Sequence, residues 1–212
     1  MGDLMENADI WPTIHTERQA LAADLRTLGQ DQWTTTSLCA EWTVRDVLAH
    51  MTATAKMKPA MFFPRLASCG FKFTRLQEKG IAENKGHSGP DTLAGFDAVL
   101  TSLGHPPGPM DTMLGEALVH AEDIRRPLGI KHDYPVAAVT RTAQFFTGSN
   151  LLIGAKRRIS GLTLRATDTD WSHGTGPEVT GPVLSLLMAM TGRKAAIDDL
   201  AGDGAAALRE RP

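Results

Sequence analysis

Four stretches in the first part of the chain carry apolar side chains at intervals of three and four positions, and this spacing constrains the fold more than any other feature. Such spacing places the apolar side chains on one face of an α-helix. The predicted helices are Ile10–Leu28, Val44–Lys58, Asp91–Leu103 and Met110–Leu128. Thr43, with Asp46 three residues later, is a predicted N-cap, and Gly129 follows the last helix. Because amphipathic helices must bury their apolar faces against one another, the sequence predicts an up-and-down four-helix bundle.

The pattern changes near residue 132. Leu162–Thr167 alternates with period two and is a predicted strand, and Glu178–Thr180 is a predicted short second strand. Val136–Arg158 and Pro182–Thr191 are predicted helices, whereas Phe62–Gly89 shows no clear period. We therefore expect a mainly α protein with two domains, a helical bundle over residues 1–132 and a smaller α+β domain over residues 133–212.

Composition excludes several classes of function. The 22 basic and 24 acidic residues give a formal charge of -2, and this balance gives no reason to expect a nucleic-acid partner. The longest apolar run, Val183–Met190, is too short to cross a membrane. The first residues, Met1–Asn7, carry neither a basic start nor an apolar stretch, so we expect a cytoplasmic protein. The sequence leaves the oligomeric state open between monomer and homodimer.

Three residues on two of the predicted helices could hold a metal ion. Glu116 and His120 are four positions apart and therefore share one face of their helix, together with apolar side chains that mark this face as buried. His50 stands beside the apolar stripe of the second helix. If the two helices face each other, two imidazoles and a carboxylate meet, which is a common ligand set for a divalent metal with one position left open. The spacing alone also fits a surface pair or a hydrogen-bonded core histidine.

Two motifs resemble a known family. The motifs are Leu38-Cys-Ala-Glu-Trp-Thr-Val-Arg-Asp-Val-Leu-Ala-His50 and Gly115-Glu-Ala-Leu-Val-His-Ala-Glu-Asp-Ile-Arg-Arg-Pro-Leu-Gly129. They resemble the mycothiol-dependent maleylpyruvate isomerases, actinobacterial members of the DinB-like metal-binding helical bundles. The resemblance implies a DinB-like four-helix bundle in which His50, Glu116 and His120 bind zinc. It extends loosely to the second domain through Thr191-Gly-Arg193 and Leu200-Ala-Gly-Asp-Gly204.

The resemblance also implies a chemistry. Mycothiol would supply a thiolate that adds to the double bond of a small electrophile, and rotation followed by loss of the thiolate would give the trans isomer. Addition without loss of the thiolate would make the protein a thiol S-transferase. Arg193, whose Gly-Arg pair resembles the family's C-terminal pattern, is the candidate catalytic residue, because an arginine can stabilise a developing enolate or a substrate carboxylate. Its position also fits a solvated arginine at the C-terminus of a helix. Asp123 could orient the imidazole of His120, and Trp42 is interpreted as a packing residue.

Two other functions remain compatible with the sequence. The first is a non-catalytic protein that binds a small molecule or regulates another protein, with a structural metal. The second is a hydrolase that uses metal-bound water, for which no additional base is evident. Neither Cys39 nor Cys69 lies in a zinc-binding or redox motif, so both are interpreted as structural or incidental.

Overall fold

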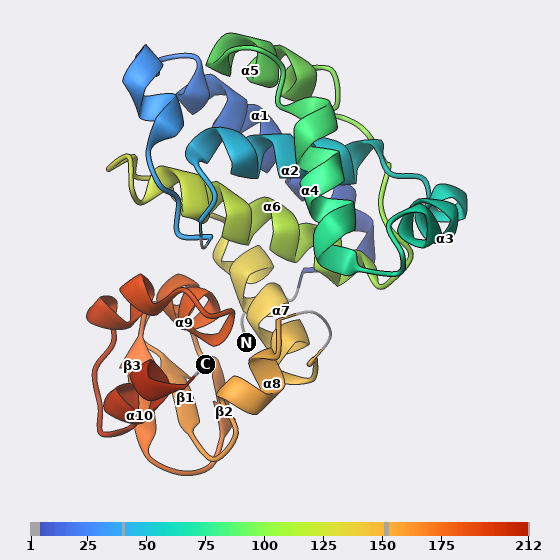
Figure 1. Ribbon diagram of the computed structural model, residues 1–212. Helices are drawn as coiled ribbons and strands as arrows, with labels where there is room; N and C mark the ends of the chain where they lie inside the picture. Colours follow the sequence, from blue (N-terminus) through green and yellow to red (C-terminus); the bar gives the residue numbers. More distant parts are fainter. Residues whose placement is uncertain (1–4, 40, 151–152, 212) are drawn as a thin grey trace. The chain divides into compact units, whose positions relative to one another are not determined.

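The computed structural model describes residues 5–39, 41–150 and 153–211, which form two compact units (Figure 1). One unit is Ile10–His132, and the other is Asp133–Pro212 together with the N-terminal segment up to Asp9. The N-terminal segment joins the second unit, where Nη1 of Arg141 donates to the Met5 carbonyl oxygen at 2.8 Å. Whether the two units are domains that fold independently stays a prediction.

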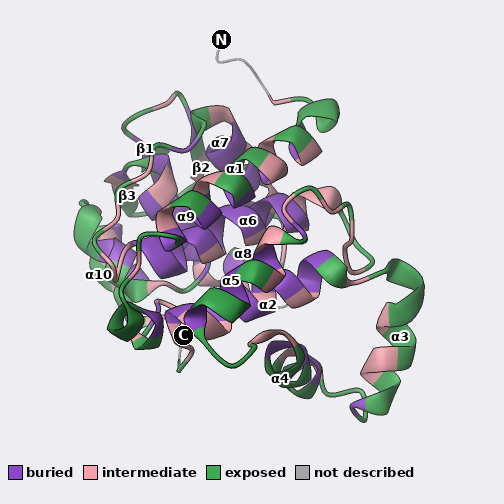
Figure 2. Cartoon of the chain, turned by 90° about the horizontal axis from the view of Figure 1, so that it is seen from above, coloured by how far each residue is buried: buried purple, intermediate pink, exposed green. Residues whose placement is uncertain are grey.

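The first unit is built on the four predicted helices. These are α1 (Ile10–Leu25), α2 (Val44–Lys56), α5 (Gly89–Asp97) and α6 (Met110–Arg125). Helix α2 packs against α5 and α6, and α1 packs against the same two helices from the other side of the core. Leu21, Leu48, Phe96 and Leu114 on these helices are fully buried. Figure 2 shows buried residues in purple along the helices of this unit. The mainly α, DinB-like architecture predicted from the sequence is confirmed.

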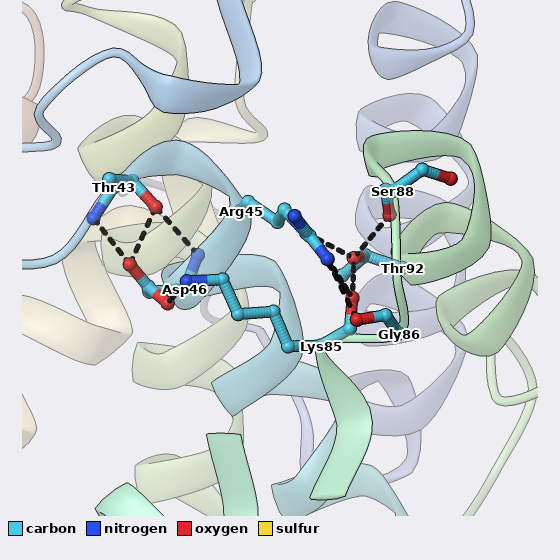
Figure 3. A network of polar contacts seen from close by, with 7 residues as sticks. All are labelled: Thr43, Arg45, Asp46, Lys85, Gly86, Ser88 and Thr92. Atoms are coloured by element: carbon cyan, nitrogen blue, oxygen red, sulfur yellow. Dashed lines mark hydrogen bonds and ion pairs between the residues drawn. The ribbon is translucent and has the colours of Figure 1, made fainter. Parts of the chain in front are cut away.

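Helix α2 begins in a polar network that anchors it to neighbouring segments (Figure 3). The Asp46 backbone N–H donates to Thr43 Oγ1 at 3.2 Å, and Asp46 Oδ2 accepts from the Thr43 backbone N–H at 3.0 Å. This reciprocal pair is the capping arrangement that the sequence predicts. Lys85 Nζ lies 2.6 Å from Asp46 Oδ1, and Arg45 Nη2 donates to the Gly86 carbonyl oxygen at 2.8 Å. The N-terminus of α2 is therefore fixed against the segment around Lys85 and Gly86.

Two further helices, α3 (Pro59–Ser68) and α4 (Phe73–Asn84), lie where the sequence shows no clear period. Helix α4 packs along α2, and α3 contacts α4. Pro59 starts α3, a position that suits proline, but Pro64 lies inside the helix. None of the residues of α3 is buried, and the side chain of Phe63 is 62% exposed. This helix therefore has no apolar stripe facing a core, which is the feature that a periodic pattern detects.

The second unit contains the predicted mixture of helices and strands. Within its described residues, three strands form a sheet in the order β2 (Ser172–Gly174), β1 (Thr163–Ala166) and β3 (Glu178–Gly181). Strand β1 is antiparallel to β2, with Leu164 opposite His173, and parallel to β3, with Leu164 opposite Val179. The helices of this unit are α7 (Val136–Thr147), α8 (Ala155–Arg158), α9 (Val183–Met190) and α10 (Gly204–Glu210). Helix α9 is buried along most of its length, as its mostly apolar sequence requires, and Ser185 is the polar residue within it.

Several predicted boundaries were wrong. Helix α1 ends at Leu25 instead of Leu28, and α6 ends at Arg125 instead of Leu128, because Pro127 lacks the N–H that would continue the helix. The helix predicted over Val136–Arg158 is divided into α7 and α8, and Leu151 and Leu152 between them lie outside the described residues, as do Ala40 in the first motif and Met1–Leu4. Short 3-10 segments also occur at Asn7–Asp9, Gln30–Thr34 and Lys194–Asp199. No helix in the described ranges has the length and apolar character needed to cross a bilayer.

Candidate metal centre

Helices α2 and α6 bring two histidine rings together. His50 lies on α2 and His120 on α6, and their ring centroids are 5.1 Å apart at an interplanar angle of 79°. Two imidazoles that bind one zinc ion tetrahedrally, at Zn–N distances of about 2 Å, have their centroids roughly 5 Å apart. The separation of these two rings therefore fits a shared ion.

The indole of Trp42 covers both rings. Its centroid lies 5.0 Å from that of His50 and 6.5 Å from that of His120. Trp42 directly precedes the N-cap Thr43, so the capping network that starts α2 also holds the indole against the two imidazoles. The interpretation of Trp42 as a packing residue holds in part, because the surface it packs against is the candidate site itself.

Asp123 fixes the orientation of the His120 ring. Its side chain is fully buried, and its Oδ2 lies 2.8 Å from His120 Nδ1. A carboxylate that accepts the Nδ1 proton leaves Nε2 as the nitrogen with a lone pair for a metal. Burial opposes protonation of His120, but hydrogen bonds to Asp123 and Cys39 outweigh it and raise its pKa to about 10. A cation at Nε2 would therefore displace a proton.

Glu116 lies one turn before His120 on α6, among apolar side chains. Met113, Ala117 and Ile124 on the same face are buried, as the sequence predicts. Burial raises the pKa of the Glu116 carboxyl, against the lowering effects of His120, a hydrogen bond with Thr54 and the charge of Arg18. A carboxylate in such surroundings is stabilised by a cation. Burial and the neighbouring His120 lower the pKa of His50 to about 3, so this imidazole is neutral.

A second set of donors shares His120. Within the described residues, the ligand atoms of Cys39, His120 and Asp123 all lie within 4.8 Å of one another, and His50 and Glu116 do not belong to this group. No motif in the sequence points to Cys39, because it stands in a loop without a zinc-binding spacing. The fold brings it to the site by a backbone hydrogen bond of 3.1 Å from Leu38 N–H to the Asp123 carbonyl oxygen.

A cavity of about 530 Å³ opens beside His50. It lies between one face each of α2, α3 and α4, and its walls include Thr54, the hydrogen-bond partner of Glu116. Of the candidate metal ligands, His50 thus borders a space large enough for a small organic molecule.

The candidate catalytic arginine belongs to the other unit. Arg193 follows α9, is partly exposed, and its Nη1 donates to the Thr191 carbonyl oxygen at 2.9 Å. Its role at the candidate metal centre therefore stays a prediction.

Comparison with known proteins identifies relatives of this fold. Residues 14–105 match the sequence model of the mycothiol maleylpyruvate isomerase N-terminal domain. The crystal structure of the mycothiol-dependent maleylpyruvate isomerase matches with a TM-score of 0.66 and 15% identity, over 95% of this chain and 94% of that one. A histidine-to-alanine mutant of that isomerase matches with a TM-score of 0.65 and 14% identity over the same shares. No curated protein sequence matches the chain. The resemblance expected from the two motifs is confirmed, and the shared fold extends over both units.

Proposed function

We propose that this chain, whose residues 14–105 belong to the mycothiol maleylpyruvate isomerase N-terminal domain family, is a metal-dependent enzyme that uses a small thiol, mycothiol, on an electrophilic substrate. The observation that carries the proposal is the pairing of two histidine rings 5.1 Å apart with a partly buried carboxylate, Glu116, on the same helix as one of them. The two reactions open to such a site are cis–trans isomerisation of the maleylpyruvate type and thiol S-transfer.

In this proposal His50, Glu116 and His120 hold a divalent ion, zinc being the ion best suited to two imidazoles and a carboxylate. When bound, the ion would stabilise the anionic form of a thiol, which is the nucleophile for both reactions. Asp123 keeps the His120 ring in the tautomer that presents Nε2. Trp42 covers the two rings and limits access of water from its side.

Arg193 is proposed to stabilise negative charge that develops on the substrate. The support is the likeness of Thr191-Gly-Arg193 to the family's C-terminal pattern. Arg193→Gln should lower kcat/KM while leaving the bound metal unchanged, whereas Arg209→Gln in the same unit should change neither. Loss of metal in the Arg193 variant would contradict a role on the substrate.

The decisive experiment measures metal and activity in the same preparations. Purified protein is expected to contain about one divalent ion per chain, and to convert cis-enedicarbonyl substrates or conjugate electrophiles only when mycothiol is present and chelator is absent. His120→Ala should lose both the ion and the activity. Activity that persists without the thiol would contradict the proposal, and would favour hydrolysis by metal-bound water.

The donor set with Cys39 is tested by a matched pair of variants. Cys39→Ser keeps the size of the side chain but removes the thiol, and His50→Ala removes one of the two ligands that only the proposed set contains. Retained metal in Cys39→Ser with lost metal in His50→Ala supports the proposed ligands. The reverse result would assign the ion to Cys39, His120 and Asp123.

A further inference from the structure

The cavity beside His50 is lined mainly by one face each of α2, α3 and α4. Helix α2 and its C-cap contribute residues spaced i, i+3, i+4 and i+7, which are His50, Ala53, Thr54 and Met57. Helix α4 contributes one face from Phe73 to Asn84, and α3 contributes the face that begins at Lys58. Gly80 on α4 lies against Ala53 on α2, where an added Cβ atom would come within 3.1 Å of the Ala53 Cβ. Helices α2 and α4 thus approach closely at Gly80, and larger side chains line the cavity elsewhere.

Much of the wall is apolar. Met57, Met61, Phe62, Phe73 and Leu76 line the space together with polar residues at its edges. Side chains of this kind bury an aromatic or alkyl group and offer no hydrogen bonds to a sugar or a polyol. The cavity therefore fits the apolar body of a ligand.

The charged groups around the cavity favour an anion. Its lining contains three cationic side chains, Lys56, Lys58 and Arg65, and one carboxylate, Glu83. Arg65 Nη2 forms an ion pair with Glu83, and Lys56 Nζ is bonded to the neutral amide of Asn84 at 2.8 Å. Two of the three positive charges are thus not balanced by a carboxylate within this lining.

One donor at the cavity has no acceptor. Arg65 Nε is buried and lacks a hydrogen-bond partner within the described residues. A buried N–H without an acceptor is costly, and it is satisfied when a ligand brings an oxygen. Lys58, Met61, Phe62 and Arg65 are spaced i, i+3, i+4 and i+7, so the donor and the apolar side chains lie on the same face of α3.

From these observations we propose that the cavity binds an organic acid with one carboxylate and an apolar aryl or alkyl body. The carboxylate is held by Arg65, with Lys58 contributing charge, and the body lies along the apolar wall toward His50. That this ligand is the electrophile of the reaction rests on the proposed function. Its binding to the cavity requires neither the metal nor the thiol.

Binding is tested first, on chelator-treated protein, by calorimetry with 4-phenylbutyrate. We expect binding that weakens at least tenfold for 4-phenylbutanamide, which lacks the charge. In the series butyrate, hexanoate and octanoate, each added methylene should tighten binding about threefold. Equal affinity for the acid and the amide, or no dependence on chain length, would overturn the proposal.

Variants of the ion pair separate the roles of Arg65 and Glu83. Arg65→Gln removes the buried donor and should weaken 4-phenylbutyrate binding about tenfold. Glu83→Gln breaks the same ion pair but keeps the donor, and should bind the acid equally or more tightly. Lys58→Gln should weaken binding less than Arg65→Gln, and Lys79→Gln, on the exposed surface of α4, should not change it. Weakening of similar size in Arg65→Gln and Glu83→Gln would show that the ion pair only maintains the structure, and would overturn the assignment.

Turnover distinguishes this inference from the function on which it rests. (Z)-3-benzoylacrylate combines a cis-enedicarbonyl group with an aromatic body and one carboxylate, and is the electrophile used for this measurement. Binding of 4-phenylbutyrate without mycothiol-dependent conversion of (Z)-3-benzoylacrylate would uphold the cavity and contradict the enzyme. Mycothiol-dependent conversion of maleylpyruvate, with no binding of 4-phenylbutyrate, would uphold the enzyme and overturn the cavity ligand.

Discussion

The two sides of the cavity differ in how firmly the fold holds them. The side formed by α2 carries His50 on a helix whose inner face is buried, and behind it on α6 the ring of His120 is fixed by Asp123 at 2.8 Å. The side formed by α3 has no buried residue and packs mainly on α4. Groups that bind a metal need fixed positions, whereas a wall that selects a substrate can vary without unfolding the bundle. This difference supports the proposal that α2 and α6 carry the metal chemistry and that α3 contributes to substrate selectivity.

The largest expected effect is on metal binding. Glu116→Ala leaves two neutral imidazoles as ligands, so the bound divalent metal should fall from about one ion per chain to a small fraction. Glu83→Ala removes a carboxylate from the other side of the cavity and should keep the metal. Metal analysis of the two purified variants makes the comparison, and a full complement of metal in Glu116→Ala would contradict the proposed ligand set.

The second expected effect is on stability. Leu48 on α2 is fully buried, and Leu48→Ala should lower the free energy of unfolding by about 2–5 kcal/mol. Phe63 on α3 is 62% exposed, and Phe63→Ala should change the free energy of unfolding by less than about 0.5 kcal/mol. Urea titrations followed by circular dichroism measure both. A similar loss in the two variants would show that α3 is as much part of the core as α2.

The same contrast explains which parts of the structure could be predicted from the sequence. Helices α1, α2, α5 and α6 bury continuous apolar stripes, so their spacing was visible, and the capping pair Thr43 and Asp46 marked the start of α2. Helix α3 contains Pro64 and has no buried face, so its sequence lacks the continuous apolar stripe that indicates a helix packed in a core.

Only the part of the candidate site that lies on helices could be predicted from the spacing of residues in the sequence. Glu116 and His120 share a helix face, and facing helices bring His50 close to His120. Cys39 and Trp42 reach the same place through the loop before α2, whose path depends on tertiary contacts such as the Leu38–Asp123 backbone hydrogen bond. No spacing in the sequence encodes that path.

The third prediction concerns the hydrogen bond by which Asp123 orients His120, a candidate metal ligand. Asp123→Asn keeps the shape of the buried side chain but removes the charge that orients His120, and should weaken metal affinity about 10- to 100-fold. Competition with a chromophoric zinc chelator measures the affinity. Asp97→Asn breaks an ion pair with Arg26 outside the site and is the control. An unchanged affinity in Asp123→Asn would mean that packing alone orients the His120 ring.

The smallest expected effect concerns the network that positions α2. Although burial acts in the opposite direction, hydrogen bonds with Lys85 and Thr43 lower the pKa of Asp46 below its ordinary value. A carboxyl whose pKa is lowered in the folded state stabilises the protein above its unfolded pKa of about 3.9, and this stabilisation is lost as the pH falls through the folded pKa. Asp46→Asn should therefore cost about 1 kcal/mol at pH 7 and less at pH 3. Lys85→Gln keeps the cap and should cost less than Asp46→Asn at pH 7. Urea unfolding at the two pH values makes the test, and a cost in Asp46→Asn that does not depend on pH would show that the charge of Asp46 contributes nothing to holding α2.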